Sequence, residues 1–249
     1  MTRIAARALD GIGEIGPGDD LAELILAAGD APAAGEIVVI AHKAISKADG
    51  RVRRLDSVVV TPLARGLAAG GQRDPRHVQA ILDETAEVVR AKDGILICRT
   101  PHGFVCANAG VDASNAPDAD TVVLLPVDPD ASARKLRARL RELTGAGPAV
   151  LVTDSFGRAW RHGQCDVAIG AAGLDPLVDW RGLPDRAGRE LAATWIALAD
   201  QIAGAADLTR SKDSGQPVVV VSGLEGYVTD DDGPGAAALI RPEAQDMFR

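Results

Sequence analysis

Acidic, hydroxyl and guanidinium side chains gather within one short run of this 249-residue chain. Asp154 and Ser155 come directly after residues 150–153, an apolar, β-branched run that is typical of a buried strand. Arg158 and Arg161 follow and bring two guanidinium groups close together. Oxygen ligands beside two fixed positive charges suit a phosphate with its divalent ion. We therefore interpret this run as a polar loop that binds such a pair; the alternative is a surface loop with an incidental ion pair.

Two lysines follow another predicted strand. Residues 36–41 are predicted to form a buried apolar strand, and Lys43 and Lys47 come just after it, four positions apart. Their ammonium groups can meet phosphates as point charges. The alternative is a solvated turn ahead of strands over residues 51–60.

Asp112 and Asn115 lie in a loop directly after a predicted hairpin with strands over residues 95–100 and 104–108. A carboxylate and an amide at the end of a strand are well placed to bind a ligand. The same residue types also cap their own turns. Turn chemistry alone leaves both interpretations open.

Residues 11–16 spell the glycine pattern GxGxxG, but the context of a dinucleotide-binding fold is missing. Such a fold needs a helix that opens on the glycines. A Pro-Gly pair interrupts here, and the next helix, over residues 21–28, takes Asp19 or Asp20 as its N-cap. A glycine-rich loop that lets a nucleotide approach the backbone remains open. No Walker A pattern occurs, which excludes a P-loop NTPase on its own motif.

The elements that must position these residues form hairpin-like strand pairs first and strand-helix alternation later, so we predict an α+β fold. We also expect that the basic residues of the helix after residue 131 mostly face water and that the acidic triplet 230–232 is solvating. The further predicted elements are a weak strand over 3–9, a helix over 75–90, a strand over 121–125, a helix capped by Ser132 with Leu136, Leu140 and Leu143 facing inward, a helix over 190–206 with Leu191, Trp195, Leu198 and Ile202 buried, a loop over 210–216 and a strand over 217–222.

Composition excludes several classes of protein. A net charge of −8 argues against a nucleic-acid or membrane partner held by general electrostatics. No apolar run approaches the roughly 20 residues of a membrane span, and the first ten residues lack the apolar core of a signal peptide. We therefore expect a cytoplasmic protein. Cys98, Cys106 and Cys165 show no CxxC spacing, and we expect reduced core thiols; the alternative is a pair formed by Cys98 and Cys106 across the hairpin.

Several sequence blocks occur in a specific order at specific separations between about residues 9 and 223. They are PGDDL at 17–21, ISKADGR at 45–51, NAGVDASN at 108–115, LPVDPD at 125–130, TDSFGRAWR at 153–161, DQIA at 200–203 and ADL at 206–208. With these blocks the chain resembles the coenzyme F420-0:L-glutamate ligases, which add glutamate to the deazaflavin precursor of coenzyme F420.

The resemblance implies GTP-dependent synthesis of an amide bond. The terminal carboxylate of F420-0 takes the γ-phosphoryl group, and the amine of L-glutamate attacks the resulting acyl phosphate. Two Mg²⁺ or Mn²⁺ ions, with K⁺ as a further candidate, are implied, held by Asp112, Asp154 and Ser155. The implied nucleotide contacts are Ile12, Gly13, Glu14, Ile15, His42, Lys43, Lys47, Asn115, Arg210, Ser211, Lys212, Asp213, Ser214, Gly215, Gln216 and Pro217. As our own hypothesis, Arg158 and Arg161 clamp a carboxylate or phosphate of the acceptor or of glutamate, so that they join Asp154 as catalytic residues.

The chain departs from the family pattern at three positions. Lys212 stands where some relatives carry an acidic ligand of the second metal, so that ligand is expected to be Asp213 or water. His42 replaces a small hydroxyl residue, and Ser155 replaces the more usual threonine. Some members continue into a flavin-binding reductase domain, whereas this chain stops at Arg249, so we predict no flavin.

The fold implied by the resemblance is a single α+β unit over residues 1–249 with two interleaved lobes, and residues 224–249 are expected to be an exposed tail. The resemblance further implies an intertwined homodimer with the nucleotide in a groove near the interface.

The alternatives to a ligase are a hydrolase and a regulatory nucleotide-binding protein. A phosphatase-type hydrolase needs a second aspartate two positions after Asp154, where Phe156 stands, and a serine-hydrolase elbow GxSxG fails at Thr153. A nucleotide-binding regulatory protein without turnover is the alternative from another class. The two aspartate loops and the arginines count against this alternative, because binding a nucleotide without turnover does not require so many charged groups.

Overall fold

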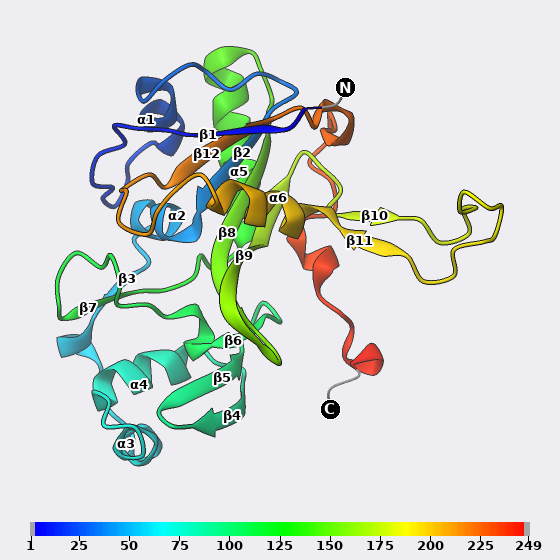
Figure 1. The fold of residues 1–249 in the computed structure, drawn as a ribbon. Coiled ribbons are helices and arrows are strands. Elements are labelled where there is room, and N and C mark those ends of the chain that lie inside the picture. Colours follow the sequence, from blue (N-terminus) through cyan, green and yellow to red (C-terminus); the bar gives the residue numbers. More distant parts are fainter. Residues whose placement is uncertain (1–2, 247–249) are drawn as a thin grey trace.

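The computed structural model describes residues 3–246 and is built around a five-stranded sheet of order β1-β12-β2-β8-β9 (Figure 1). The parallel pair is β2 with β8, and the other neighbouring strands of the sheet pair antiparallel. The strand bounds are Ala5–Ala8 for β1, Ile37–Ala41 for β2, Ala149–Arg158 for β8, Arg161–Ala172 for β9 and Val218–Ser222 for β12.

Helices cover both faces of this sheet. They are α1 (Leu21–Ala27), α2 (His42–Ala48) and α5 (Pro129–Thr144) on one face and α6 (Leu198–Asp207) on the other. Successive strand residues point to opposite faces, so Val38 and Val150 join one buried cluster while Val39 and Leu151 join the other. Burial on both faces explains why these strands are continuous apolar runs rather than alternating ones.

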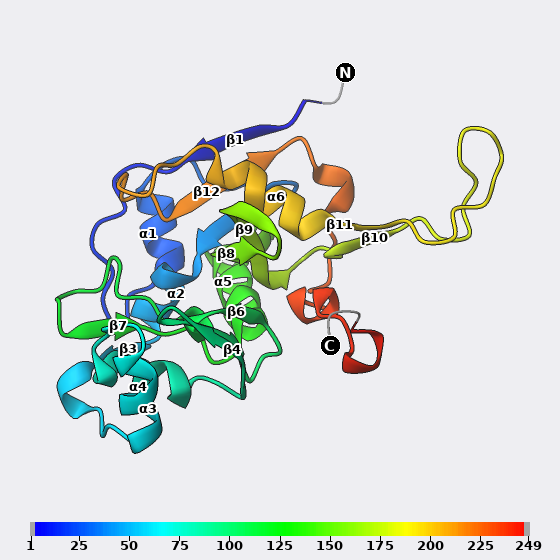
Figure 2. The same cartoon turned by 60° about the horizontal axis from the view of Figure 1, so that its bottom comes forward.

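Residues between β2 and β8 form a further buried cluster, which includes Ile81, Leu96 and Val122. This part lies below the five-stranded sheet in Figure 1 and comes forward in Figure 2. Its strands pair as β3 with β7 and as β4-β5-β6. The bounds are Val52–Arg54 for β3, Pro62–Ala69 for α3, Pro75–Asp83 for α4, Glu87–Lys92 for β4, Ile95–Arg99 for β5, Val105–Ala107 for β6 and Thr121–Val123 for β7.

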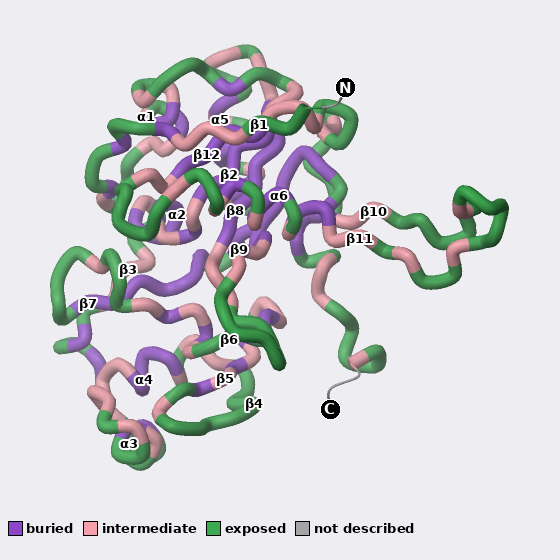
Figure 3. The backbone as a smooth tube through the Cα atoms, in the orientation of Figure 1, coloured by how far each residue is buried: buried purple, intermediate pink, exposed green. Residues whose placement is uncertain are grey.

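Two hairpins leave the main body. The ends of β8 and β9 run on beyond the sheet and become exposed, and the arm made by β10 (Leu177–Asp179) and β11 (Trp195–Ala197) projects outward with its long connection (Figures 1 and 3). Short 3-10 turns occupy Leu55–Ser57, Asn108–Gly110, Glu225–Tyr227, Ala236–Leu239 and Glu243–Gln245. No helix within residues 3–246 has the length and apolar character needed to cross a membrane.

The mixture of helices and sheets confirms the predicted α+β class. The predicted strands at β1, β2, β7, β8 and β12, the first helix with Asp20 as its N-cap, and the hairpin of β5 and β6 are also confirmed. Cys98 and Cys106 are directly opposite each other in that hairpin and are free thiols, as expected.

The polar run after residue 153 was predicted to be a loop, and this was wrong. Strand β8 continues through it to Arg158, and the chain turns at Trp160, whose φ is 57°. Pairing with β9 supplies the reason, because Ser155 lies opposite Asp166 and the hydrogen-bond ladder extends to Arg158. Lys43 and Lys47 lie in helix α2 and not in the solvated turn that was the alternative for them, and Ile45 of this helix packs into the core.

Two helix predictions placed the boundaries wrongly. Helix α4 ends at Asp83, and Val88 and Val89 belong to the exposed strand β4. Val88 pairs with Cys98 of β5, and the register shifts between Val88 and Arg90, so Val89 lies at an irregularity of the ladder. A helical periodicity does not reveal this pairing. The late helix α6 begins at Leu198, eight positions after the predicted start at residue 190, because Trp195 pairs with Asp179 in the projecting arm.

Helix α5 begins at Pro129 with Asp128, not Ser132, as its N-cap. Leu143, predicted to face inward, has 39% of its surface exposed. Arg137, predicted to face water, is buried and donates to the carbonyls of Pro148, Thr229 and Asp231. It also pairs with Asp232 of the acidic triplet at 2.8 Å, so this arginine holds the segment after β12 against the helix.

Candidate active site

A cavity of about 600 Å³ opens at the carboxyl end of β2 and beside Thr153, Asp154 and Ser155 in the middle of β8. The two strands are parallel, and the last residue of β2, Ala41, pairs with Thr153, so these polar residues of β8 begin where β2 ends, a place where ligands of such sheets commonly bind. The cavity walls come from the glycine-rich loop, helix α2, the loop at 112–115, the middle of β8 and the loop at 210–217. This volume is within the roughly 300–1,000 Å³ typical of small-molecule sites.

The cavity brings together most residues singled out from the sequence. All of the predicted nucleotide contacts except Ile12 line it, and so do the three predicted metal ligands Asp112, Asp154 and Ser155. Ile12 is instead part of the hydrophobic core. Arg158 and Arg161 lie exposed near the hairpin tip and are not part of the lining. The additional lining residues are Ala41, Ala44, Ser114, Thr153, Gln164, Asp166 and Asp207.

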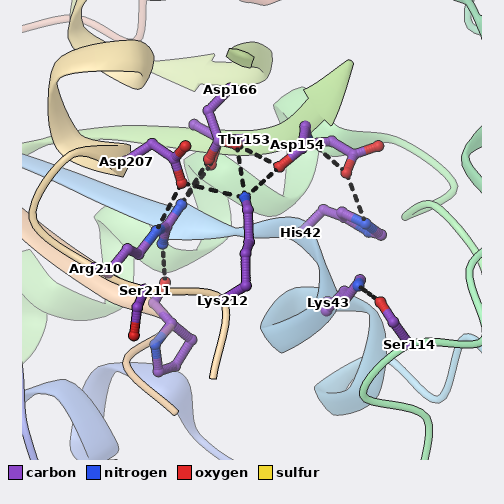
Figure 4. Close-up of polar contacts among 12 residues, drawn as sticks. His42, Lys43, Ser114, Thr153, Asp154, Asp166, Asp207, Arg210, Ser211 and Lys212 are labelled. Atoms are coloured by element: carbon purple, nitrogen blue, oxygen red, sulfur yellow. Dashed lines mark hydrogen bonds and ion pairs between the residues drawn. The ribbon is translucent and has the colours of Figure 1, made fainter. Parts of the chain in front are cut away.

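Lys43 organises the loop that carries Asp112. Its ammonium donates to Oδ2 of Asp112 at 2.6 Å. It also donates to Oγ of Ser114 at 2.6 Å (Figure 4). The amide and hydroxyl of Ser114 each donate to the carboxylate of Asp112 at 2.7 Å. Burial raises the pKa of Asp112, but the hydrogen bonds from Lys43 and Ser114 outweigh it and lower the pKa below its ordinary value. The carboxylate is therefore ionised at neutral pH.

Asp154 lies against a buried histidine. Nε2 of His42 is 3.4 Å from Oδ1 of Asp154, and within the described residues this nitrogen makes no well-aligned hydrogen bond. The amide of Ser155 donates to Asp154 at 2.8 Å. Burial raises the pKa of Asp154, and interactions with His42 and Lys43 together with the Ser155 amide bring it below its ordinary value. A second ionised carboxylate therefore borders the cavity.

Ser155 and Asp166 form a separate polar cluster. Because Asp154 and Ser155 are consecutive in β8, their side chains point to opposite faces of the strand. Ser155 donates to Oδ1 of Asp166 at 2.5 Å. Arg210 donates to Oδ2 of Asp166 at 2.7 Å (Figure 4). Asp166 is only 3% exposed, so Arg210 compensates a carboxylate that is buried. Sequence reasoning missed Asp166 because its role depends on the register between β8 and β9.

Each of four cations at the cavity is held by an acidic side chain. Lys43 pairs with Asp112, Lys47 with Glu14, Arg210 with Asp166, and Lys212 lies 3.3 Å from Asp207. The side chain of Glu14 is 78% exposed, so the anion of a ligand can replace Glu14 as the partner of Lys47. Such an arrangement can bind several phosphate oxygens at once.

The carboxylates of Asp112 and Asp154 fit a hard divalent ion. Mg²⁺ is usually held by one or two carboxylates together with substrate phosphates and water, and both of these groups are ionised and line the cavity. Residues 3–246 contain no group of three or more histidine, cysteine or acidic side chains that could enclose an ion alone. Ser155, the predicted ligand of a second ion, accepts a hydrogen bond from Lys212 at 2.7 Å.

Comparisons with known proteins agree with the resemblance. The family model for F420-0:γ-glutamyl ligase matches residues 11–223. The coenzyme F420:L-glutamate ligase of Methanopyrus kandleri is 45% identical over 95% of this chain and 94% of its own length. The enzyme of the same name from Methanothermobacter thermautotrophicus is 41% identical over 97% of both chains. That of Methanocaldococcus jannaschii is 42% identical over 86% of this chain and 85% of its own length.

Proposed function

The chain belongs to the F420-0:γ-glutamyl ligase family, and from this premise we propose that it joins L-glutamate to F420-0 at the expense of GTP. The observation that carries the proposal is the single cavity in which two ionised carboxylates face lysines from α2 and the loop at 210–217. This combination suits a nucleoside triphosphate with its divalent ion.

The chemistry begins with a carboxylate, which is a poor electrophile. An oxygen of the F420-0 carboxylate attacks the γ-phosphorus of GTP, the bond to the β-phosphate oxygen breaks, and GDP leaves. The amine of glutamate then attacks the acyl carbon, the C–O bond breaks, and inorganic phosphate and a proton are released. The product is an amide, and phosphate is the leaving group that makes the substitution possible.

In this reaction Lys43, Lys47 and the 210–217 loop bind the phosphates. Asp112 and Asp154 hold the divalent ion, Mg²⁺ or Mn²⁺, which offsets negative charge on the phosphates when bound. His42 lies behind Asp154 and positions its carboxylate. The proposed contacts of the glycine-rich loop, Gly13 to Ile15, come from backbone that lines the same cavity.

Arg158 and Arg161 are proposed to hold the acceptor. Arg158 lies four positions after Asp154 along β8, which is about 13 Å of extended strand. An acceptor that reaches both the ion site and these guanidinium groups must therefore be long, and F420-0 carries its carboxylate at the end of an extended side chain. A bidentate guanidinium contact suits either a phosphodiester or a carboxylate.

We also propose that the protein acts as a homodimer of two-lobed subunits. The arm of β10 and β11 carries exposed Trp180, Leu183 and Trp195, and apolar groups on a projecting arm are typical of an interface. Light scattering after gel filtration measures the mass of the assembly directly. A monomer at micromolar concentration would remove this part of the proposal.

The decisive experiment is mass spectrometry of F420-0 after incubation with the protein, L-glutamate, GTP and Mn²⁺. We expect mass increments of one or more glutamate residues, with release of GDP and phosphate, and loss of both in Asp154→Asn. Omission of glutamate is the control for background hydrolysis. Tight GTP binding without increments or phosphate release would instead favour a regulatory nucleotide-binding protein.

A further inference from the structure

The ammonium group of Lys212 lies among three oxygens at the wall of the cavity. Nζ donates to Oγ of Ser155 at 2.7 Å. It also donates to Oδ1 of Asp207 at 3.3 Å and is 3.6 Å from Oδ1 of Asp166 (Figure 4). The oxygens come from β8, β9 and the end of α6. Three separate elements therefore converge on one cation that belongs to the chain.

This oxygen set has the chemistry of a divalent-ion site. One hydroxyl and two carboxylates are hard ligands of the kind that Mg²⁺ and Mn²⁺ prefer. Asp166 is 3% and Asp207 25% exposed, whereas the side chain of Lys212 is 70% exposed. The anions are fixed in the protein, and the cation reaches them from the solvent side.

The charges on this side of β8 balance without a metal ion. The carboxylates of Asp166 and Asp207 face the guanidinium of Arg210 and the ammonium of Lys212. A divalent ion on Ser155 would lie within a few ångströms of the ammonium, and like charges at that separation repel strongly. Ion and ammonium therefore exclude each other from the same oxygens.

We propose that Lys212 supplies the positive charge on the Ser155 side of β8 in place of a second divalent ion. The chain then uses one divalent ion, on Asp112 and Asp154, and one built-in ammonium. An ammonium has three N–H donors, and within the described residues two are engaged, by Ser155 and Asp207. The third is directed to a phosphate oxygen in the cavity, a role that rests on the proposed function.

The test counts Mn²⁺ ions bound to the full chain by electron paramagnetic resonance, without nucleotide, F420-0 or glutamate. We expect Lys212→Ala to bind one more ion per chain than the wild type, because removing the ammonium opens the oxygen set. Lys212→Arg keeps a cation and is expected to match the wild type. Equal counts in Lys212→Ala and the wild type would overturn the proposal.

A second pair of variants locates the additional ion. Lys212→Met keeps the aliphatic part of the side chain and should gain the ion as Lys212→Ala does. Lys212→Met combined with Asp207→Asn should return to the wild-type count, and an additional ion that survives there contradicts the assignment. Since no substrate is present, the result is independent of whether the chain ligates glutamate.

Discussion

The guanidinium of Arg210 and the carboxylate of Asp166 form an ion pair at 2.7 Å in which the two side chains are 9% and 3% exposed. It ties the loop after α6 to strand β9, and the same loop supplies the wall of the cavity from Arg210 to Pro217. Arg210 also donates to the carbonyl of Pro217 at 3.0 Å, which closes the loop on itself. This buried contact therefore helps to fix the part of the cavity wall that the loop supplies.

Replacing this arginine should be costly. Arg210→Met leaves the buried carboxylate of Asp166 with Lys212 at 3.6 Å as its cation, and breaking a buried pair in this way typically costs about 3–5 kcal/mol. We expect a lowered urea midpoint and weakened nucleotide binding. Arg186→Met at an exposed position is the matched control and should change stability by less than about 0.5 kcal/mol. Equal midpoints for the two variants would contradict a structural role of the pair.

Lys47 should contribute to nucleotide binding without supporting the fold. Its partner Glu14 is largely exposed, so Lys47→Met leaves no buried charge uncompensated. Loss of one charge-assisted contact to a phosphate should raise the Kd for a fluorescent GTP analogue about tenfold, equivalent to about 1.4 kcal/mol. Lys92→Met, on exposed strand β4, is the control and should bind normally. An unchanged Kd for Lys47→Met would remove Lys47 from the phosphate site.

Stability should fall in acid because of Asp112. The pKa of its carboxyl is lower in the folded protein than in the unfolded chain, where it is about 3.9. A carboxyl group whose pKa is depressed by folding contributes stability that is fully present above its pKa in the unfolded chain. This stability is lost as the pH falls through its pKa in the folded protein. We expect Asp112→Asn to reduce the difference between urea midpoints at pH 7 and pH 3, whereas Asp175→Asn at an exposed position leaves the difference intact. An identical difference in the wild type and Asp112→Asn would exclude this contribution.

The two exposed arginines should act on the acceptor alone. Arg158 lies outside the cavity lining and donates to the carbonyl of His162 at 2.8 Å, so Arg158→Ala should leave GTP binding unchanged. We expect about a tenfold higher KM for F420-0 in Arg158→Ala and in Arg161→Ala. Steady-state kinetics with each substrate varied in turn separates the effects. An unchanged KM and turnover for F420-0 would remove the proposed clamp.

Local sequence patterns correctly predicted the elements that form because of residues close together in the chain. Strands β2, β8 and β12 are continuous apolar runs, and such runs must be buried on both faces wherever they pair. Asp20 caps α1 because its side chain accepts hydrogen bonds from the amides two and three residues further along the chain. All the residues involved therefore lie within one short stretch of sequence. The polar residues that follow the apolar runs were recognised for the same reason, since the two lie next to each other in the chain.

Elements that depend on distant partners were not recognised. Val88 follows a helix and fits its periodicity, yet Val88 pairs with Cys98 and Arg90 with Ile97 of β5, so this segment is a strand. Trp195 likewise pairs with Asp179, sixteen positions earlier, so the late helix begins after it. Local propensity is a weak prior, and tertiary pairing overrides it in both cases.

The sequence by itself determined the fold class, the family and most of the residues that line the cavity, because these are expressed in short blocks and their order along the chain. Only the tertiary structure decided how those residues act on one another. The register of β8 against β9 places Asp166 opposite Ser155, and the loop at 210–217 then brings Arg210 and Lys212 to the same oxygens. Such contacts join residues 11 to 57 positions apart, and distances of that kind arise from strand pairing and packing rather than from any local pattern.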